Sequence, residues 1–73
     1  MATQIVMDHT GDTRHVFEAS DAEARGKAEA RFKALVESGF TPAVREPTGE
    51  VRITRSFDPT AQETLFYPRL VGG

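Results

Sequence analysis

Two runs of β-prone residues lie near the start of the chain, on either side of a cluster of turn-forming residues. The first run covers residues 5–7 and the second covers residues 13–18, while residues 8–12 between them contain two aspartates and a glycine. Aspartate accepts local hydrogen bonds and glycine tolerates positive φ angles, so both favour turns. The pattern therefore predicts an antiparallel hairpin with a loop of about four or five residues.

The next stretch has the period of an amphipathic helix. Ser20, followed three residues later by Glu23, matches a capping box, so the helix is expected to begin at this serine. The apolar residues recur at helical spacing and form one stripe: Ala24, Ala28, Phe32, Leu35 and Val36. Gly39 is expected to end the helix in a left-handed conformation.

Three more strands are predicted after the helix. Residues 40–45 alternate in polarity, but Pro42 cannot donate a hydrogen bond, so this strand should be short or lie at a sheet edge. Residues 51–57 alternate as in a strand with one buried and one solvated face. The last strand, Glu63–Tyr67, contains successive apolar residues, which favours an interior position in the sheet.

The predicted elements follow one another as strand, strand, helix, strand, strand, strand. A single helix can cover one face of a mixed sheet, which is an economical two-layer α+β arrangement for a short chain. If the last strand lies beside the first and parallel to it, the architecture is the β-grasp. The folded domain is expected to cover residues 1–68 and to leave residues 69–73 as a flexible C-terminal arm.

Composition narrows the classes of function. A chain of 73 residues can form one small domain, near the lower limit for a self-supporting core. Nine basic and eleven acidic residues give a net charge of -2, so the chain lacks the basic excess that binding to DNA or RNA requires. Neither a signal peptide nor a membrane span is predicted. We therefore expect a soluble cytoplasmic protein with neither nucleic acid nor membrane as a partner.

Four side chains that could bind a transition metal lie close together in the first predicted hairpin: Asp8, His9, Asp12 and His15. The alternative, which we favour, is that the two aspartates accept hydrogen bonds in the turn, since nothing in the pattern fixes one histidine relative to the other. Ser20 or Ser38 could join a histidine and an aspartate in a hydrolytic triad, but no nucleophile-elbow motif surrounds either serine. We expect neither a metal site nor an enzyme.

The last residues of the sequence are unusual in composition: Pro68-Arg69-Leu70-Val71-Gly72-Gly73. Two glycines without side chains make a narrow arm that can enter a tight channel. Because the sequence has no cysteine, the Gly73 carboxylate is the group that remains for covalent carriage. The alternative is a frayed tail that carries its glycines incidentally.

The order of elements, the length and this ending resemble the ubiquitin-like β-grasp proteins, particularly the small sulfur-carrier subunits of molybdopterin and thiamine biosynthesis. The former typically end in Pro-Pro-Val-Ala-Gly-Gly, which this chain matches at Pro68, Gly72 and Gly73. Arg69 replaces the second proline, and two aliphatic residues occupy similar places, Leu70 and Val71. Segments 8–14 and 57–59 also resemble a group of short bacterial proteins with the same Gly-Gly ending.

The resemblance implies that a partner enzyme of the ubiquitin-activating type adenylates the Gly73 carboxylate with ATP. The adenylate would then become a thiocarboxylate or be joined to an amine, and the sequence does not choose between these two fates. A sulfurtransferase, a synthase subunit or a deconjugating peptidase could be a further partner. The residues expected to contact a partner are Arg69, Leu70, Val71 and whichever of Phe66 and Tyr67 faces away from the helix.

The resemblance also implies that the chain binds no cofactor of its own and is not itself an enzyme. A different reading is a small non-covalent interaction module, of phage or mobile-element origin, for which the Gly-Gly tail is incidental. Such a module would use a sheet face or an edge strand to bind its partner.

Overall fold

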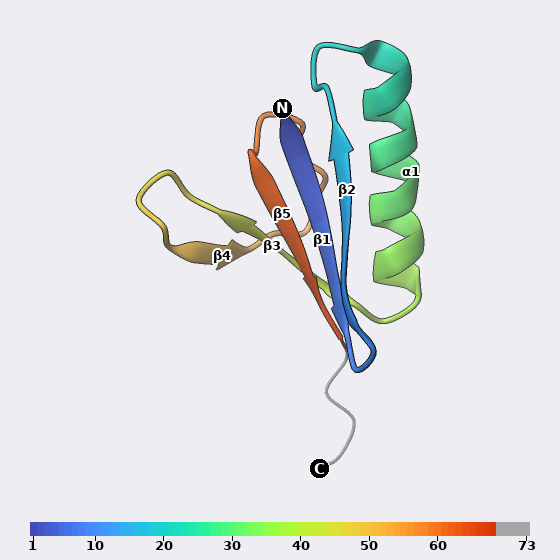
Figure 1. Ribbon diagram of the computed structural model, residues 1–73, viewed down its shortest axis with the longest axis vertical. Coiled ribbons are helices and arrows are strands. Elements are labelled where there is room, and N and C mark those ends of the chain that lie inside the picture. The colour runs from blue at the N-terminus through green and yellow to red at the C-terminus, as the bar shows by residue number, and fades with distance from the viewer. Residues whose placement is uncertain (69–73) are drawn as a thin grey trace.

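One helix packs against one face of a five-stranded sheet in the computed structural model, which describes residues 1–68 (Figure 1). The elements are β1 (Ala2–Asp8), β2 (Gly11–Phe17), α1 (Ala22–Glu37), β3 (Thr41–Arg45), β4 (Val51–Ile53) and β5 (Glu63–Tyr67). The strand order in the sheet is β2-β1-β5-β3-β4. The predicted α+β class, with one helix on a mixed sheet, is confirmed.

The last strand lies at the centre of the sheet. β5 pairs in parallel with β1, where Ile5 lies opposite Leu65, and antiparallel with β3, where Ala43 lies opposite Leu65. Leu65 and Phe66 are almost completely buried. The interior position predicted from the three successive apolar residues is therefore confirmed.

Aromatic rings fill the space between the helix and the sheet. Phe32 of α1 meets Phe66 of β5 edge to face, with 5.6 Å between ring centroids. Phe57 lies 5.9 Å from Phe32 and 6.2 Å from Phe17. Such tilted and edge-to-face pairs place the positive edge of one ring near the negative face of another. The core thus joins α1, the sheet and the segment that follows β4.

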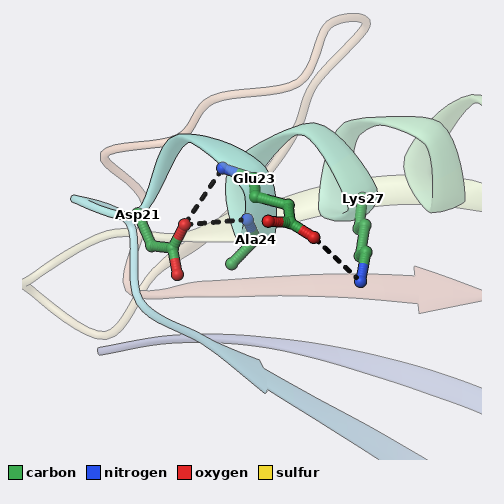
Figure 2. A network of polar contacts seen from close by, with 4 residues as sticks. All are labelled: Asp21, Glu23, Ala24 and Lys27. Atoms are coloured by element: carbon green, nitrogen blue, oxygen red, sulfur yellow. Dashed lines mark hydrogen bonds and ion pairs between the residues drawn. The ribbon is translucent and has the colours of Figure 1, made fainter.

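The helix begins one residue later than predicted. Asp21 is the N-cap, and its carboxylate accepts hydrogen bonds from the backbone N–H groups of Glu23 (3.0 Å) and Ala24 (3.3 Å) (Figure 2). The expected cap, Ser20, instead donates to the Glu18 side chain at 3.5 Å. A carboxylate satisfies the free N–H groups and also interacts favourably with the positive end of the helix dipole, which explains why aspartate takes the position.

The end of the helix and most of its apolar stripe agree with the prediction. Gly39 has a φ of 102°, and its N–H donates to the Val36 carbonyl at 3.0 Å. Ala28 and Phe32 are buried, and Ala24 and Leu35 are half-buried. Val36 is the exception, because 40% of its surface remains exposed. Within residues 1–68, no helix has the length and apolar character needed to cross a membrane.

The first hairpin is tighter than predicted. Asp8 pairs with Gly11, so the loop contains two residues rather than four or five. The Asp8 carboxylate accepts hydrogen bonds from the backbone N–H of Thr10, at 2.8 Å, and from its hydroxyl. Gly11 has a φ of 125°, which a residue with a side chain rarely adopts. The strands therefore extend further into the turn-forming cluster than the sequence indicates.

Of the two alternatives expected for the strand that contains Pro42, the edge position is wrong, because β3 lies between β5 and β4, and the strand has five residues. The Pro42 carbonyl accepts a hydrogen bond from the Thr54 N–H at 3.1 Å, just beyond the end of β4. The ring nitrogen points to the same side as this carbonyl, towards a position where the β3–β4 pairing has ended. The missing donor is thus tolerated inside the sheet.

The predicted strand over residues 51–57 is also largely wrong. β4 ends at Ile53, and both Val51 and Ile53 are exposed rather than buried on one face. Phe57 lies outside the strand and packs on the helix side of the sheet. The alternation of apolar residues therefore reflects a short edge strand followed by a loop that returns to the core.

Candidate functional site

The alternation of side chains along β5 decides which aromatic residue can meet a partner. Phe66 packs against Phe32 on the helix side and is 0% exposed, so it is not the aromatic residue that faces away from the helix. Tyr67 follows it in the strand and lies on the opposite side, where 37% of its surface is exposed. Of the two aromatic candidates, Tyr67 alone can contact another molecule.

The sheet face opposite α1, which we call the open face, has a buried centre and an exposed apolar rim. Its centre is a row of paired residues that are almost fully buried: Ile5, Leu65 and Ala43. Val16 on β2, Ile53 on β4 and Tyr67 remain exposed around this row. The rim therefore offers separate apolar contacts, in addition to the backbone edges of the sheet.

The predicted activation site and the remaining partner contacts lie outside the described residues. These are Gly73 and Gly72 for activation, and Arg69, Leu70 and Val71 for partner contact. β5 ends at Tyr67, and Pro68 is the last described residue. The structure describes the strand that precedes these residues, and this strand lies at the centre of the sheet.

The first hairpin does not assemble a metal site. The Asp8 carboxylate is engaged by Thr10, whose hydroxyl and N–H lower its pKa from the usual 3.8. Asp12 lies on the open face, whereas His15 lies on the helix side of the same strand. Within residues 1–68, no group of three histidine, cysteine, aspartate or glutamate side chains could hold a metal ion. The turn hydrogen bonds expected for aspartate are present at Asp8.

The two serines considered for a triad are engaged elsewhere. The Ser38 hydroxyl donates to the Ala34 carbonyl of its own helix at 2.9 Å, and the Ser20 hydroxyl donates to Glu18. In the part of the chain that the structure describes, neither serine hydroxyl is hydrogen-bonded to a histidine. This arrangement activates no hydroxyl as a nucleophile.

A cleft of about 650 Å³ lies between the β3–β4 hairpin and the loop that leads into β5. Two ion pairs stand at its border, Arg45 Nε to Glu63 Oε1 and Arg52 Nε to Glu46 Oε1, each at 2.7 Å. The sequence does not indicate this cleft, because its charged residues come from four separate segments. Each arginine is paired with a glutamate and Asp58 also lines the cleft, so its side chains have no positive excess that would attract an anion.

A buried polar contact that the sequence does not predict joins the sheet and the helix. Gln4 is fully buried, and its Nε2 donates to the Ala28 carbonyl at 3.0 Å. Its Oε1 accepts from the Arg31 guanidinium at 2.7 Å. His15 lies opposite Gln4 on β2, and partial burial, followed by the Arg31 charge, lowers its pKa below the usual 6.5. The signal in the sequence is a glutamine at an inward position between Ala2 and Val6.

Comparisons with known proteins add no assignment to this geometry. No protein-family model matches the chain, and no curated protein or solved structure shows significant similarity to it.

Proposed function

We propose that this chain is a ubiquitin-like β-grasp carrier or modifier whose Gly73 carboxylate is activated by a partner enzyme. The observation that supports the proposal most is the position of β5. This strand runs parallel to β1 at the centre of the sheet, and α1 covers the face that carries Phe66. It is also the last described element before the Gly-Gly sequence.

The packing of β5 supports a role as an anchor for a reactive end. Leu65 and Phe66 are buried on opposite sides of the sheet, so the strand is fixed on both faces. Tyr67 is the first residue along the strand that is substantially exposed again. A partner enzyme would therefore bind the open face near Tyr67 while it acts on residues further along the chain.

The proposed chemistry begins with attack of the Gly73 carboxylate on the α-phosphate of ATP, which releases pyrophosphate and forms an acyl-adenylate. A sulfur donor or an amine then attacks the carbonyl carbon, and AMP leaves. A free carboxylate is a poor acyl donor, so the activation is needed for either fate. The proposal concerns this carboxylate whether it is a translated end or is exposed by cleavage.

The test is intact-mass spectrometry of the protein recovered from its native host. A gain of about 16 Da that maps to Gly73, and not to a methionine, would identify a thiocarboxylate and a sulfur carrier. A lysine adduct joined through Gly73 would identify a protein modifier. An unmodified chain in cells that express its neighbouring genes would contradict the proposal.

A matched pair of variants sharpens this test. Deletion of Gly73 should abolish both modification and transfer, because the terminal carboxylate would then belong to Gly72 and lie one residue closer to β5. Gly26→Ala on α1 should leave both unchanged, since it lies in an exposed helical position far along the chain from the reacting group. Normal activation of the Gly73 deletion would remove the basis of the proposal.

A non-covalent interaction module is the second candidate, and the exposed rim of the open face favours it. Val16, Ile53 and Tyr67 would each supply apolar contact area to a bound protein. A partner captured equally by the whole chain and by residues 1–68 alone would favour this function. A partner that requires residues 69–73 would favour the carrier.

A further inference from the structure

The two edges of the sheet differ in their capacity to pair with another strand. β4, at one edge, has three residues, whereas β2, at the other, has seven and contains no proline (Figure 1). Exposed edges present unpaired N–H and C=O groups, and short strands or prolines are common ways to blunt them. Within residues 1–68, β2 pairs with β1 alone. β2 therefore offers the longer row of unpaired backbone groups to a further strand.

Two opposite charges stand along this edge without a partner inside the sheet. Asp12 and Arg14 are exposed and lie on the open face. Their neighbours on β1 are Met7 and Ile5, which are apolar. No ion pair in the described part of the chain involves either charge. The outer side of β2 is therefore a side from which these charges can be matched.

We propose that β2 pairs antiparallel with β2 of a second copy of this chain, with the two-fold axis at Thr13. In this register Asp12 of each copy lies opposite Arg14 of the other, which gives two symmetric ion pairs on the open face. On the helix side, Thr13 lies opposite itself and His15 lies opposite Gly11. A Cβ atom placed on Gly11 would meet nothing within 4 Å, so the histidine has room beside it.

The neighbouring registers are disfavoured by charge. In an antiparallel pair, two residues that lie opposite each other either both direct their backbone N–H and C=O groups towards the partner strand or both direct them away. The two-fold axis of a symmetric pair therefore passes through a residue, and each alternative register has its axis at another residue. An axis at Arg14 would place the two arginines opposite each other. An axis at Asp12 would place the two aspartates opposite each other. Like charges in directly opposite positions destabilise a sheet, and the Thr13 axis alone among these three avoids them.

Pairing in this register would produce one continuous sheet of about ten strands, since each copy contributes five. The two-fold axis is perpendicular to such a sheet, so both helices lie on the same face. β5 is separated from the junction by β1, so the strand that leads to the Gly-Gly sequence is not part of the contact. The proposal is therefore independent of the carrier function.

Sedimentation velocity over a range of concentrations at low salt tests the pairing. Dimerisation of the whole chain is expected, and either Asp12→Arg or Arg14→Asp should weaken it about tenfold, because each creates two like-charge contacts. The double variant D12R/R14D exchanges the two charges and should restore the dimer. A monomer at every concentration, or single variants that associate like the unmodified chain, would overturn the proposal.

Cysteine crosslinking then tests the register, because the chain contains no cysteine of its own. Under mild oxidation Thr13→Cys should form disulfide-linked dimers faster than Arg14→Cys or His15→Cys, since a residue at the axis lies opposite itself. Lys33→Cys on the exposed side of α1 gives the rate of random collision. Faster crosslinking at position 14 or 15, or no excess over position 33, would contradict the Thr13 axis.

Discussion

Gln4 shows how one polar side chain fixes the orientation of a helix on a sheet. Its amide is fully buried, with Ala28 and Arg31 of α1 as its hydrogen-bonding partners. A buried amide that loses a partner retains the cost of desolvation, while an apolar residue of similar shape would not carry that cost. The contact therefore favours one placement of α1 over others that would bury the same apolar stripe.

Replacement of Arg31 by methionine should lower the free energy of unfolding by about 1–3 kcal/mol, because the Gln4 carbonyl oxygen loses its donor. Gln4→Leu in the same background should recover part of this loss. Urea denaturation of the single and double variants measures the coupling. Lys33→Met is the control, since its ion pair with Glu29 is exposed and contributes little. Equal effects at positions 31 and 33 would show that the buried contact is not stabilising.

His15 should make stability depend on pH. Its folded pKa lies below 6.5, first because of partial burial and then because of Arg31, so the unfolded chain binds the proton more tightly. The contribution of neutral His15 to the free energy of unfolding is complete above about pH 6.5 and is lost as the pH falls through the folded pKa. His15→Gln should reduce the slope of unfolding free energy in this window, as measured by urea denaturation from pH 7 to pH 5. An unchanged slope would contradict the prediction.

The carboxyl groups of Asp8 and Asp58 make stability depend on pH in a lower range than His15 does. A threonine hydroxyl two residues later hydrogen-bonds to each of them and is the main reason that their pKa values fall below 3.8. The stability associated with these turns is therefore present above pH 3.8 and is lost as the pH falls through the folded pKa. The pH range in which His15 affects stability lies above the range of the two aspartates, so the pH dependence due to His15 can be measured separately.

At the scale of a single element, α1 carries one residue that weakens it. Gly26 lies on the exposed side, and a Cβ atom added there would meet nothing within 4 Å. Gly26→Ala should raise the free energy of unfolding by about 0.5–1 kcal/mol, because alanine loses less conformational entropy in a helix. Thermal and urea unfolding of the purified variant measure the change.

Gly39→Ala is the matched comparison for this prediction. Its φ of 102° is unfavourable for a residue with a side chain, so the same substitution should lower stability by about 1 kcal/mol. The two substitutions are therefore expected to change the free energy of unfolding in opposite directions. A shift of the same sign at both would show that the conformation of Gly39 does not control the end of the helix.

The sequence predicts elements well where local signals agree with packing. The stripe on α1 and the apolar run of β5 have this character, and both elements form at the predicted places. β4 and the segment after it do not, because alternation alone cannot distinguish a strand from a loop that returns one side chain to the core. Pro42 misleads for a related reason: whether its missing N–H costs a hydrogen bond depends on where the pairing with β4 ends.

At the scale of the whole molecule, Phe57 connects a loop to the core. It contacts Phe17 of β2 and Phe32 of α1, so it packs against both layers. Phe57→Ala should lower the free energy of unfolding by about 2–3 kcal/mol, less than for a fully buried phenylalanine because this ring is half-buried. Ile53→Ala is the control from the same predicted strand and should change stability by less than about 0.5 kcal/mol.

Urea denaturation of these two variants compares them directly. The predicted strand over residues 51–57 would give Ile53 and Phe57 the same buried face and therefore similar losses. The fold described above gives unequal losses, because Ile53 is 69% exposed. Equal effects would contradict the packing of the loop against the core.

The candidate site could be predicted from the sequence in part. The apolar run of β5 predicts that one of its two aromatic residues faces away from the helix, but the register that directs Phe66 inward and Tyr67 outward depends on where the other strands lie. The unmatched charges of β2 are visible as residues, yet their position at an edge follows from the strand order of the sheet. Long-range pairing, which local sequence does not encode, decides both.

The parallel pairing of β1 and β5 also determines how the molecule would respond to mechanical force. The pair runs from Thr3 opposite Glu63 to Val6 opposite Phe66. Tension between the start of β1 and the end of β5 acts along these strands in shear, so their hydrogen bonds must break together. Tension across the open end of the β1–β2 hairpin would break its pairs one after another. A partner that pulls on the end of β5 would therefore meet its greatest resistance at the centre of the sheet.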